Sequence, residues 1–107
     1  MSRVARFDVD LPADVQIAVR VLSSRLRVAL LHELARGPRS TSQLIAALGL
    51  LDRNTLMENL RDLEEHGVVA GDPLPPLRPG RTTTWSIRGP RLADLTKALS
   101  KHVTPRR

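Results

Sequence analysis

Hydrogen-bonding side chains of several kinds are gathered in one short stretch of this chain. Arg53, Asn54 and Thr55 come directly after Asp52, which the sequence pattern places as the cap of a helix. Arginine can pair with guanine through two hydrogen bonds and asparagine with adenine, and the carboxylate of Glu58 can accept a hydrogen bond from cytosine. This stretch therefore predicts base reading in the major groove of DNA. The candidate base-reading residues are Arg53, Asn54, Thr55, Met57, Glu58 and Arg61.

A second group of side chains can bind phosphates. Residues 78–91 hold four arginines and no acid, and Arg78 and Arg81 flank Pro79-Gly80 at the expected tip of a hairpin. From a hairpin tip they could reach phosphates or a neighbouring minor groove. Hydroxyl and amide side chains at the start of a further helix could donate to phosphate oxygens, or could serve only to cap that helix. The candidate backbone contacts are Ser40, Thr41, Ser42, Gln43, Arg78 and Arg81.

The overall composition fits one basic domain. The chain has 107 residues, a net charge of +6 and a pI near 11.4. That charge favours a polyanionic partner such as nucleic acid, although simple solubility or an arginine-rich proteome also accounts for it. The absence of cysteine excludes disulfides, thiolate metal sites and cysteine nucleophiles. The first residues contain no long apolar run, so we expect neither signal peptide nor membrane span, and a cytoplasmic location.

Nothing in the sequence predicts an enzyme, a cofactor or a metal site. There is no glycine-rich phosphate loop, nucleophile elbow or cluster of metal-ligating residues. His32 and His66 are isolated, and Asp94 and His102 are spaced so that they do not lie side by side on a helix.

Helical patterns cover residues 12–67. The second helix carries leucines on one face, and the fourth has a core stripe of Leu56, Leu60 and Leu63. A capping-box pattern opens the third helix, and a glycine follows the third and fourth. The residues expected to start or end these helices are Pro12, Ser24, Gly37, Ser40, Gly49, Asp52 and Gly67.

A hairpin and one more helix follow. Residues 68–70 read as a short strand, residues 71–80 as a loop with four prolines, and residues 82–87 as a returning strand. The last helix, residues 91–103, has only a narrow apolar stripe. The predicted fold class is mainly α with a small β-hairpin: a winged helix-turn-helix with five helices and a two-stranded wing.

The first and last helices carry apolar side chains that suggest a second subunit. The first is apolar on more than one side, which favours packing on its own core and on a partner, or simple burial in the core. The stripe on the last helix fits docking on a partner or against the first helix. The candidate homodimer contacts are Val15, Ile17, Val19, Leu22, Leu95 and Leu99.

These patterns define the expected domain boundaries. We expect a flexible basic arm over residues 1–10, a winged helix-turn-helix domain over 11–103 and a disordered tail over 104–107. Within the domain, the helix-turn-helix covers 40–67, the wing 68–88 and the last helix 91–103.

Residues 22–87 resemble the bacterial winged-helix regulators of the arsenic-repressor (ArsR) type, and MarR-type regulators more distantly. The resemblance rests on LSSRLRVALLHELARGP, STSQLIAALGL, NTLMENLRDLEEHGVV and GRTTTW in this order. It implies a homodimer that binds a double-stranded operator and represses transcription, often until a ligand binds. Metal-sensing members commonly carry thiolates beside the recognition helix. This chain has none, so metal sensing is not implied.

The expected recognition helix is acidic, which weakens its attraction for DNA. Its residues include only two arginines, Arg53 and Arg61, but five acids: Asp52, Glu58, Asp62, Glu64 and Glu65. We therefore expect only its first turn to read bases, with the wing supplying much of the affinity. Met57 could touch a thymine methyl group or be an ordinary surface methionine. Two other functions stay open: a winged-helix module for protein contacts, and an architectural protein of a mobile element in recombination or plasmid maintenance.

Overall fold

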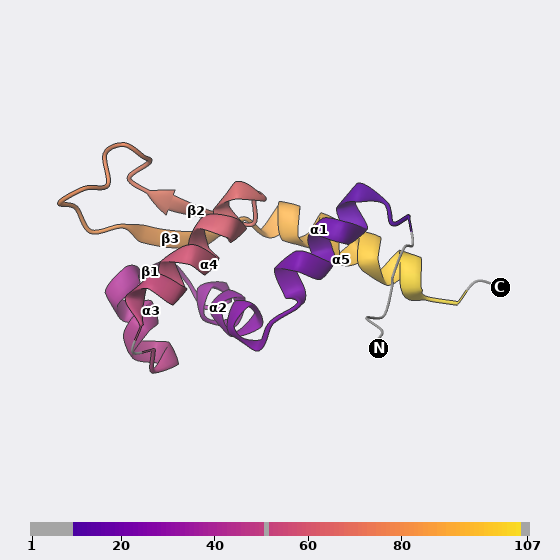
Figure 1. The fold of residues 1–107 in the computed structure, drawn as a ribbon, viewed down its shortest axis with the longest axis horizontal. Coiled ribbons are helices and arrows are strands. Elements are labelled where there is room, and N and C mark those ends of the chain that lie inside the picture. Colours follow the sequence, from indigo (N-terminus) through magenta and orange to yellow (C-terminus); the bar gives the residue numbers. More distant parts are fainter. Residues whose placement is uncertain (1–9, 51, 106–107) are drawn as a thin grey trace, which may run out of the picture.

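The structure, a computed structural model, describes residues 10–50 and 52–105. Most of the predicted N-terminal arm and the end of the predicted tail lie outside these residues. Within these residues, five helices and three short strands follow one another (Figure 1). They are α1 (Ala13–Leu22), α2 (Arg25–Ala35), β1 (Arg39–Ser40), α3 (Thr41–Leu48), α4 (Arg53–Glu65), β2 (Val69–Asp72), β3 (Thr84–Ile87) and α5 (Gly89–Val103). The predicted fold class is confirmed.

The helices of the recognition unit begin and end where their capping residues predict. Ser40 Oγ accepts a hydrogen bond from the Gln43 amide, and the Gln43 side chain accepts one from the Ser40 amide, which completes the capping box. Asp52 Oδ1 accepts from the Asn54 amide at 2.9 Å. Gly49 ends α3 with φ +63°, a left-handed conformation that glycine adopts without a steric penalty. Local sequence therefore sets the length and start of both helices.

Helix α5 begins two residues earlier than predicted. It starts at Gly89 and has Pro90 in its first turn. A proline is accommodated at that position because the first turn has no helical partner for its missing N–H.

One core joins the helices to the sheet. Leucines from α2, α3 and α4 share this core with Trp85 of β3, which is fully buried. The Trp85 indole Nε1 donates to Thr41 Oγ1 at 3.0 Å, so the polar end of this side chain is satisfied inside the core. This contact ties the wing to the start of α3.

The sheet has three antiparallel strands in the order β1–β3–β2. In the wing hairpin, Val69 pairs with Ile87 and Asp72 with Thr84. The two-stranded wing is confirmed, and the sheet also contains β1, which the sequence did not predict and whose Arg39 pairs with Trp85 of β3. A strand of two residues is too short to show an alternating pattern in the sequence. It joins the wing to the residue that caps α3.

Helices α1 and α5 lie against each other and extend away from the rest of the molecule (Figure 1). The molecule is accordingly elongated, with extents of 50 × 38 × 26 Å. Val15 of α1 and Leu95 of α5 are buried inside this two-helix arm. They were predicted as homodimer contacts, but they already pack within the chain and have almost no surface left for a partner. In the described part of the chain, no helix has the length and apolar character needed to cross a membrane.

Candidate nucleic-acid interface

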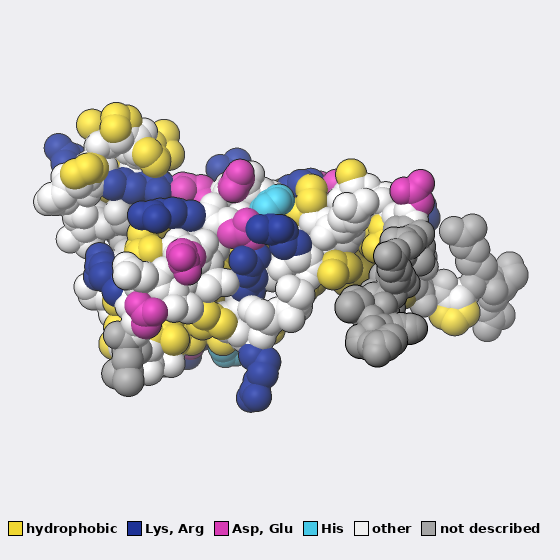
Figure 2. Space-filling view, in the orientation of Figure 1, with side chains coloured by type: hydrophobic (Ala, Val, Ile, Leu, Met, Phe, Trp, Pro, Cys, Tyr) yellow, Lys and Arg dark blue, Asp and Glu magenta, His cyan; other side chains and the backbone are white. Residues whose placement is uncertain are grey.

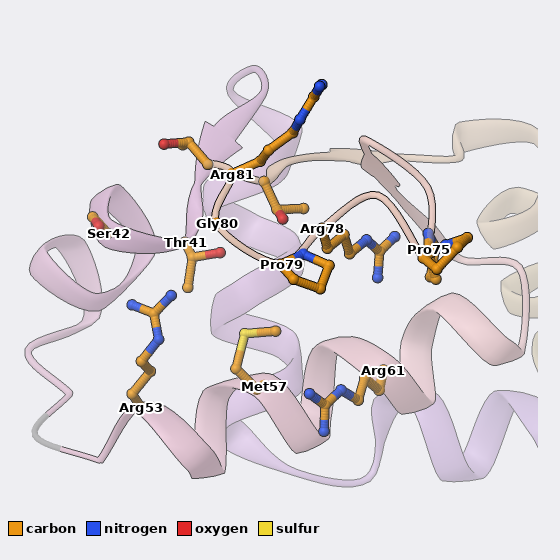
Figure 3. A pocket seen from close by; sticks show the side chains of 13 residues that line it. Thr41, Ser42, Arg53, Met57, Arg61, Pro75, Arg78, Pro79, Gly80 and Arg81 are labelled. Carbon is orange, nitrogen blue, oxygen red and sulfur yellow. The ribbon is translucent and has the colours of Figure 1, made fainter.

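An open groove of about 720 Å³ separates α4 from the wing (Figure 3). One wall is α4 and the other is the loop between β2 and β3, while the start of α3 closes one end. The residues that line it are Thr41, Ser42, Arg53, Met57, Arg61, Pro75, Pro76, Arg78, Pro79, Gly80, Arg81, Thr82 and Thr83. Residues from three segments of the chain therefore meet here.

The α4 wall is formed by side chains one helical turn apart. Arg53, Met57 and Arg61 follow at intervals of four residues and so share one face of the helix. Both arginines are exposed, and neither makes an ion pair with a described residue. Met57 is half-buried and packs against the core, so it forms the apolar floor between them. The groove thus places two available guanidinium groups on either side of a methionine.

The two remaining exposed candidates on α4 lie on its outer side. Asn54 and Glu58 are exposed, with a spacing of four residues. Thr55 is different, since its hydroxyl donates to Asp52 Oδ2 at 2.8 Å and the residue is half-buried. Hydrogen bonds from the Thr55 hydroxyl and then from the Asn54 amide lower the pKa of Asp52. Thr55 therefore completes the helix cap, and its base-reading role stays a prediction with little geometric support.

At the start of α3, the four predicted phosphate contacts differ in access. Ser42 and Gln43 are exposed, and Ser40 is half-buried with its hydroxyl in the capping box. Thr41 is buried; its hydroxyl accepts a hydrogen bond from Trp85, and its amide donates to Thr83 O at 3.2 Å. Thr41 is corrected from a phosphate contact to a core residue that joins α3 to the wing.

Arg78 is directed into the protein instead of toward solvent (Figure 3). Its guanidinium forms two hydrogen bonds with Glu64 of α4, at 3.0 and 2.5 Å. It also lies 4.9 Å from the centroid of the Trp85 ring, within the range of a cation–π contact. The hydrogen bond from Arg78 is the main cause that lowers the pKa of Glu64. Arg78 is therefore corrected from a phosphate contact to a bridge between the wing and α4.

Arg81 is available at the tip of the wing. It is exposed, lines the groove and extends away from the loop in Figure 3. Gly80 before it has φ +76°, which allows the tight turn closed by the Arg81 amide on Arg78 O at 3.0 Å. The turn directs Arg78 inward and Arg81 outward, although the sequence presents them as a symmetric pair.

The acids of α4 lie mostly away from the groove. Asp62 pairs with Arg20 of α1 at 3.0 Å and with Arg27 of α2, and Arg27 Nε also donates to Asn59 Oδ1 at 2.8 Å. Together with the Glu64–Arg78 pair, this neutralises two of the carboxylates that make the helix acidic in sequence. Sequence reasoning missed this network because the paired residues are 42 and 35 positions apart. Glu58 and Glu65 are the acids of α4 that stay exposed.

The sequence of residues 22–72 matches the family model of a helix-turn-helix domain. The chain is also 32% identical over 87 residues to the HTH-type transcriptional regulator YvaP of Bacillus subtilis strain 168, with 81% of each chain covered. The chain belongs to the helix-turn-helix transcriptional regulators. The HTH-type transcriptional regulator sll1512 of Synechocystis shows the same identity over 87 residues, and the regulator described here spans 64% of its length.

The fold of this regulator is that of the ArsR type, as the sequence predicts. The crystal structure of the ArsR family transcriptional regulator RHA00566 aligns with a TM-score of 0.69 at 22% identity, covering 87% of this chain and 90% of that one. The family and fold are those of DNA-binding transcriptional regulators and not of enzymes. The roles of individual residues at the groove are not addressed by these similarities and stay predictions.

Proposed function

We propose that this regulator binds operator DNA as a homodimer and represses transcription by occupying the promoter. In this arrangement α4 enters the major groove, and the wing lies on the neighbouring backbone or minor groove. The observation that carries the proposal is the groove between α4 and the wing, where exposed Arg53 and Arg61 line the α4 wall and exposed Arg81 lines the loop wall. Because Asp62 and Glu64 are paired with arginines, their charges do not offset the positive charge of the groove.

The exposure of each side chain indicates whether it contacts bases or phosphates. Arg53 and Asn54 are exposed in the first turn of α4, the part of a recognition helix that contacts base edges. Arg61 lies on the α4 side of the groove and Arg81 on the loop side, and both exposed side chains suit phosphate oxygens. Ser42 lines the same groove, and both it and the exposed Gln43 can donate to the DNA backbone. Sequence preference therefore comes from the first turn, and salt-dependent affinity from the flanking arginines.

Selection of bound duplexes from a random pool tests the proposal most directly. We expect an enriched palindrome whose half-sites are separated by about one helical turn, 34–36 Å. Binding to it should weaken with salt, with a log–log slope of about −0.9 for each phosphate neutralised. Transcription from a promoter carrying this palindrome should fall when the protein is added. Failure to enrich any duplex would remove the DNA-binding proposal, and enrichment of many phased sites would favour an architectural role.

A second candidate function is a winged-helix module for protein contacts. The observation that favours it is the exposed pair of carboxylates, Glu58 and Glu65, on the outer side of α4. Reversal of the charge at Glu65, which is not a candidate base-reading residue, separates the two functions. It should strengthen the binding of DNA if α4 faces phosphates, and it should abolish capture of a basic protein partner if α4 faces protein.

A further inference from the structure

The tip of the wing exposes a small apolar cluster. Leu74 and Leu77 are 65% and 59% exposed, and Pro75 and Pro76 between them are exposed as well. Figure 2 shows hydrophobic side chains gathered over the wing loop, with basic side chains between this loop and the helices. Exposed apolar clusters with a polar rim commonly mark binding surfaces. The wing loop therefore carries both apolar and basic side chains, since exposed Arg81 follows the leucines in the same loop.

The backbone that carries these leucines is held in place before any partner binds. The Leu77 amide donates to Leu74 O at 2.9 Å, which closes a turn across the two prolines. Arg78 connects the loop to α4: its Nε donates to Pro73 O at 2.7 Å, and its guanidinium pairs with Glu64. Proline also fixes φ and removes conformational freedom. A preorganised tip loses little entropy when it docks, which favours binding.

The position of the tip points to DNA as its occupant. Pro75 and Pro76 line the same groove as Arg53 and Arg61, so the apolar cluster is continuous with the proposed DNA-binding surface. When α4 lies in the major groove, the wing extends along the duplex toward the next minor groove. Arg81 of the same loop can meet phosphates there, and the exposed leucines would then face the floor of the minor groove.

We propose that Leu74 and Leu77 insert into the minor groove of the operator, partly unstack one base step and bend the duplex. This inference rests on the proposed function and adds a mode of recognition to it. Proteins that insert leucine or proline side chains between base steps kink DNA by about 20–90°. Pyrimidine–purine steps unstack most readily, so the wedge selects such a step without a hydrogen bond to any base.

The double variant Leu74→Ala/Leu77→Ala tests the wedge. Its matched control is Val28→Ala, which removes an apolar side chain that is 48% exposed on α2. Affinity is measured over a range of salt, and bending by energy transfer between dyes at the two ends of the selected duplex. We expect the double variant to bind about tenfold more weakly, from the lost apolar burial. Its salt slope should equal that of the wild type, its bend should be lost, and Val28→Ala should behave as the wild type.

The other outcomes each overturn a defined part of the reasoning. Unchanged affinity and bending in the double variant overturn the wedge and leave DNA binding intact. Absence of binding to any duplex by the wild type overturns the proposed function as well. If the double variant keeps its affinity and bend but loses self-association, or loses binding to purified RNA polymerase, the tip is a protein-contact surface and the wedge is overturned.

Discussion

At the scale of single residues, Arg53 and Asn54 are the strongest candidates for reading bases. Both are exposed in the first turn of α4, and Asp52 fixes the direction of that turn by capping it. Replacing either by alanine should relax sequence preference, at about 1–3 kcal/mol for each lost base pairing. The measurement is competition between the selected operator and duplexes changed at one base pair. Arg25→Ala, an exposed arginine on α2, is the matched control. An equal loss on every duplex would instead assign Arg53 or Asn54 to the phosphates.

Arg78 and Arg81 have different roles in the wing, and residue types alone do not distinguish these roles. The sequence correctly predicts an arginine-rich wing, and it gives both side chains the same role. Arg78 is instead held by Glu64, which lies 14 positions earlier in the chain. Thr41 is similar, because its hydroxyl contacts a tryptophan 44 positions away. Contacts between distant residues decide which polar side chains are left for a partner, and a pattern of neighbours does not contain them.

At the scale of elements, local chemistry predicts most of the fold. The Ser40 capping box, the Asp52 cap and the glycines after α3 and α4 are signals within a few residues, and the helices begin and end beside them. Strand β1 was missed because its two residues become a strand only by pairing with β3. The bridge from the wing to α4 was missed for the same reason. Elements are thus locally encoded, whereas their attachment to one another is not.

The attachment of the wing to α4 leads to a prediction for Gly71 in β2. A Cβ atom at Gly71 would lie 2.6 Å from Arg78 Nη2 and 2.8 Å from the Trp85 ring. Gly71→Ala should therefore displace the Arg78 bridge and lower the free energy of unfolding by about 1–3 kcal/mol, as overpacking does. Chemical denaturation measures this change. Gly89→Ala is the matched control, since no described atom beyond its chain neighbours and its own helix backbone lies within 4 Å of its Cβ position. Equal stability of the two variants would contradict a closely packed bridge.

At the scale of the whole molecule, Asp62 joins the two-helix arm to the recognition helix. Its carboxylate binds Arg20 of α1 and Arg27 of α2, and its side chain is only 13% exposed. The hydrogen bond from Arg20 is the main cause that lowers the pKa of Asp62, with a further contribution from Arg27. Because the folded pKa lies below the unfolded one, this stabilisation is present above the ordinary value of 3.8 and is lost as pH falls through the folded pKa.

Asp62→Asn should therefore lower the free energy of unfolding at neutral pH. In this variant the free energy of unfolding should also decrease less as the pH falls from neutral to acidic. We expect a loss of about 2 kcal/mol at pH 7, between the values typical of exposed and buried ion pairs. Urea denaturation at a series of pH values from neutral to acidic measures both effects. Glu65→Gln on the exposed side of α4 should stay within about 0.5 kcal/mol of the wild type. An unaltered acid profile in Asp62→Asn would mean that the network does not contribute to stability.

The arm also determines where a second subunit can bind. Val15 and Leu95 are buried within the pair of helices α1 and α5, so they offer almost no surface to a partner. The apolar side chains that stay exposed on these two helices include Val19, at 45%, and Val103, at 66%. A charge at Val19 would have to be buried in any interface formed there, which is strongly unfavourable without a partner. The proposed homodimer is thus most vulnerable at this position.

Val19→Glu should give the monomer mass in light scattering at micromolar concentration, whereas Val28→Glu on α2 should give the dimer mass. On DNA, the Val19→Glu protein should bind one half-site and gain nothing from a second. The wild type should lose affinity when about five base pairs are inserted between half-sites, because that places them on opposite sides of the duplex. A wild-type monomer would remove the homodimer from the proposed function. If the Val19→Glu variant is still a dimer, the subunits do not meet at the outer side of α1. Another surface would then determine the spacing of the half-sites.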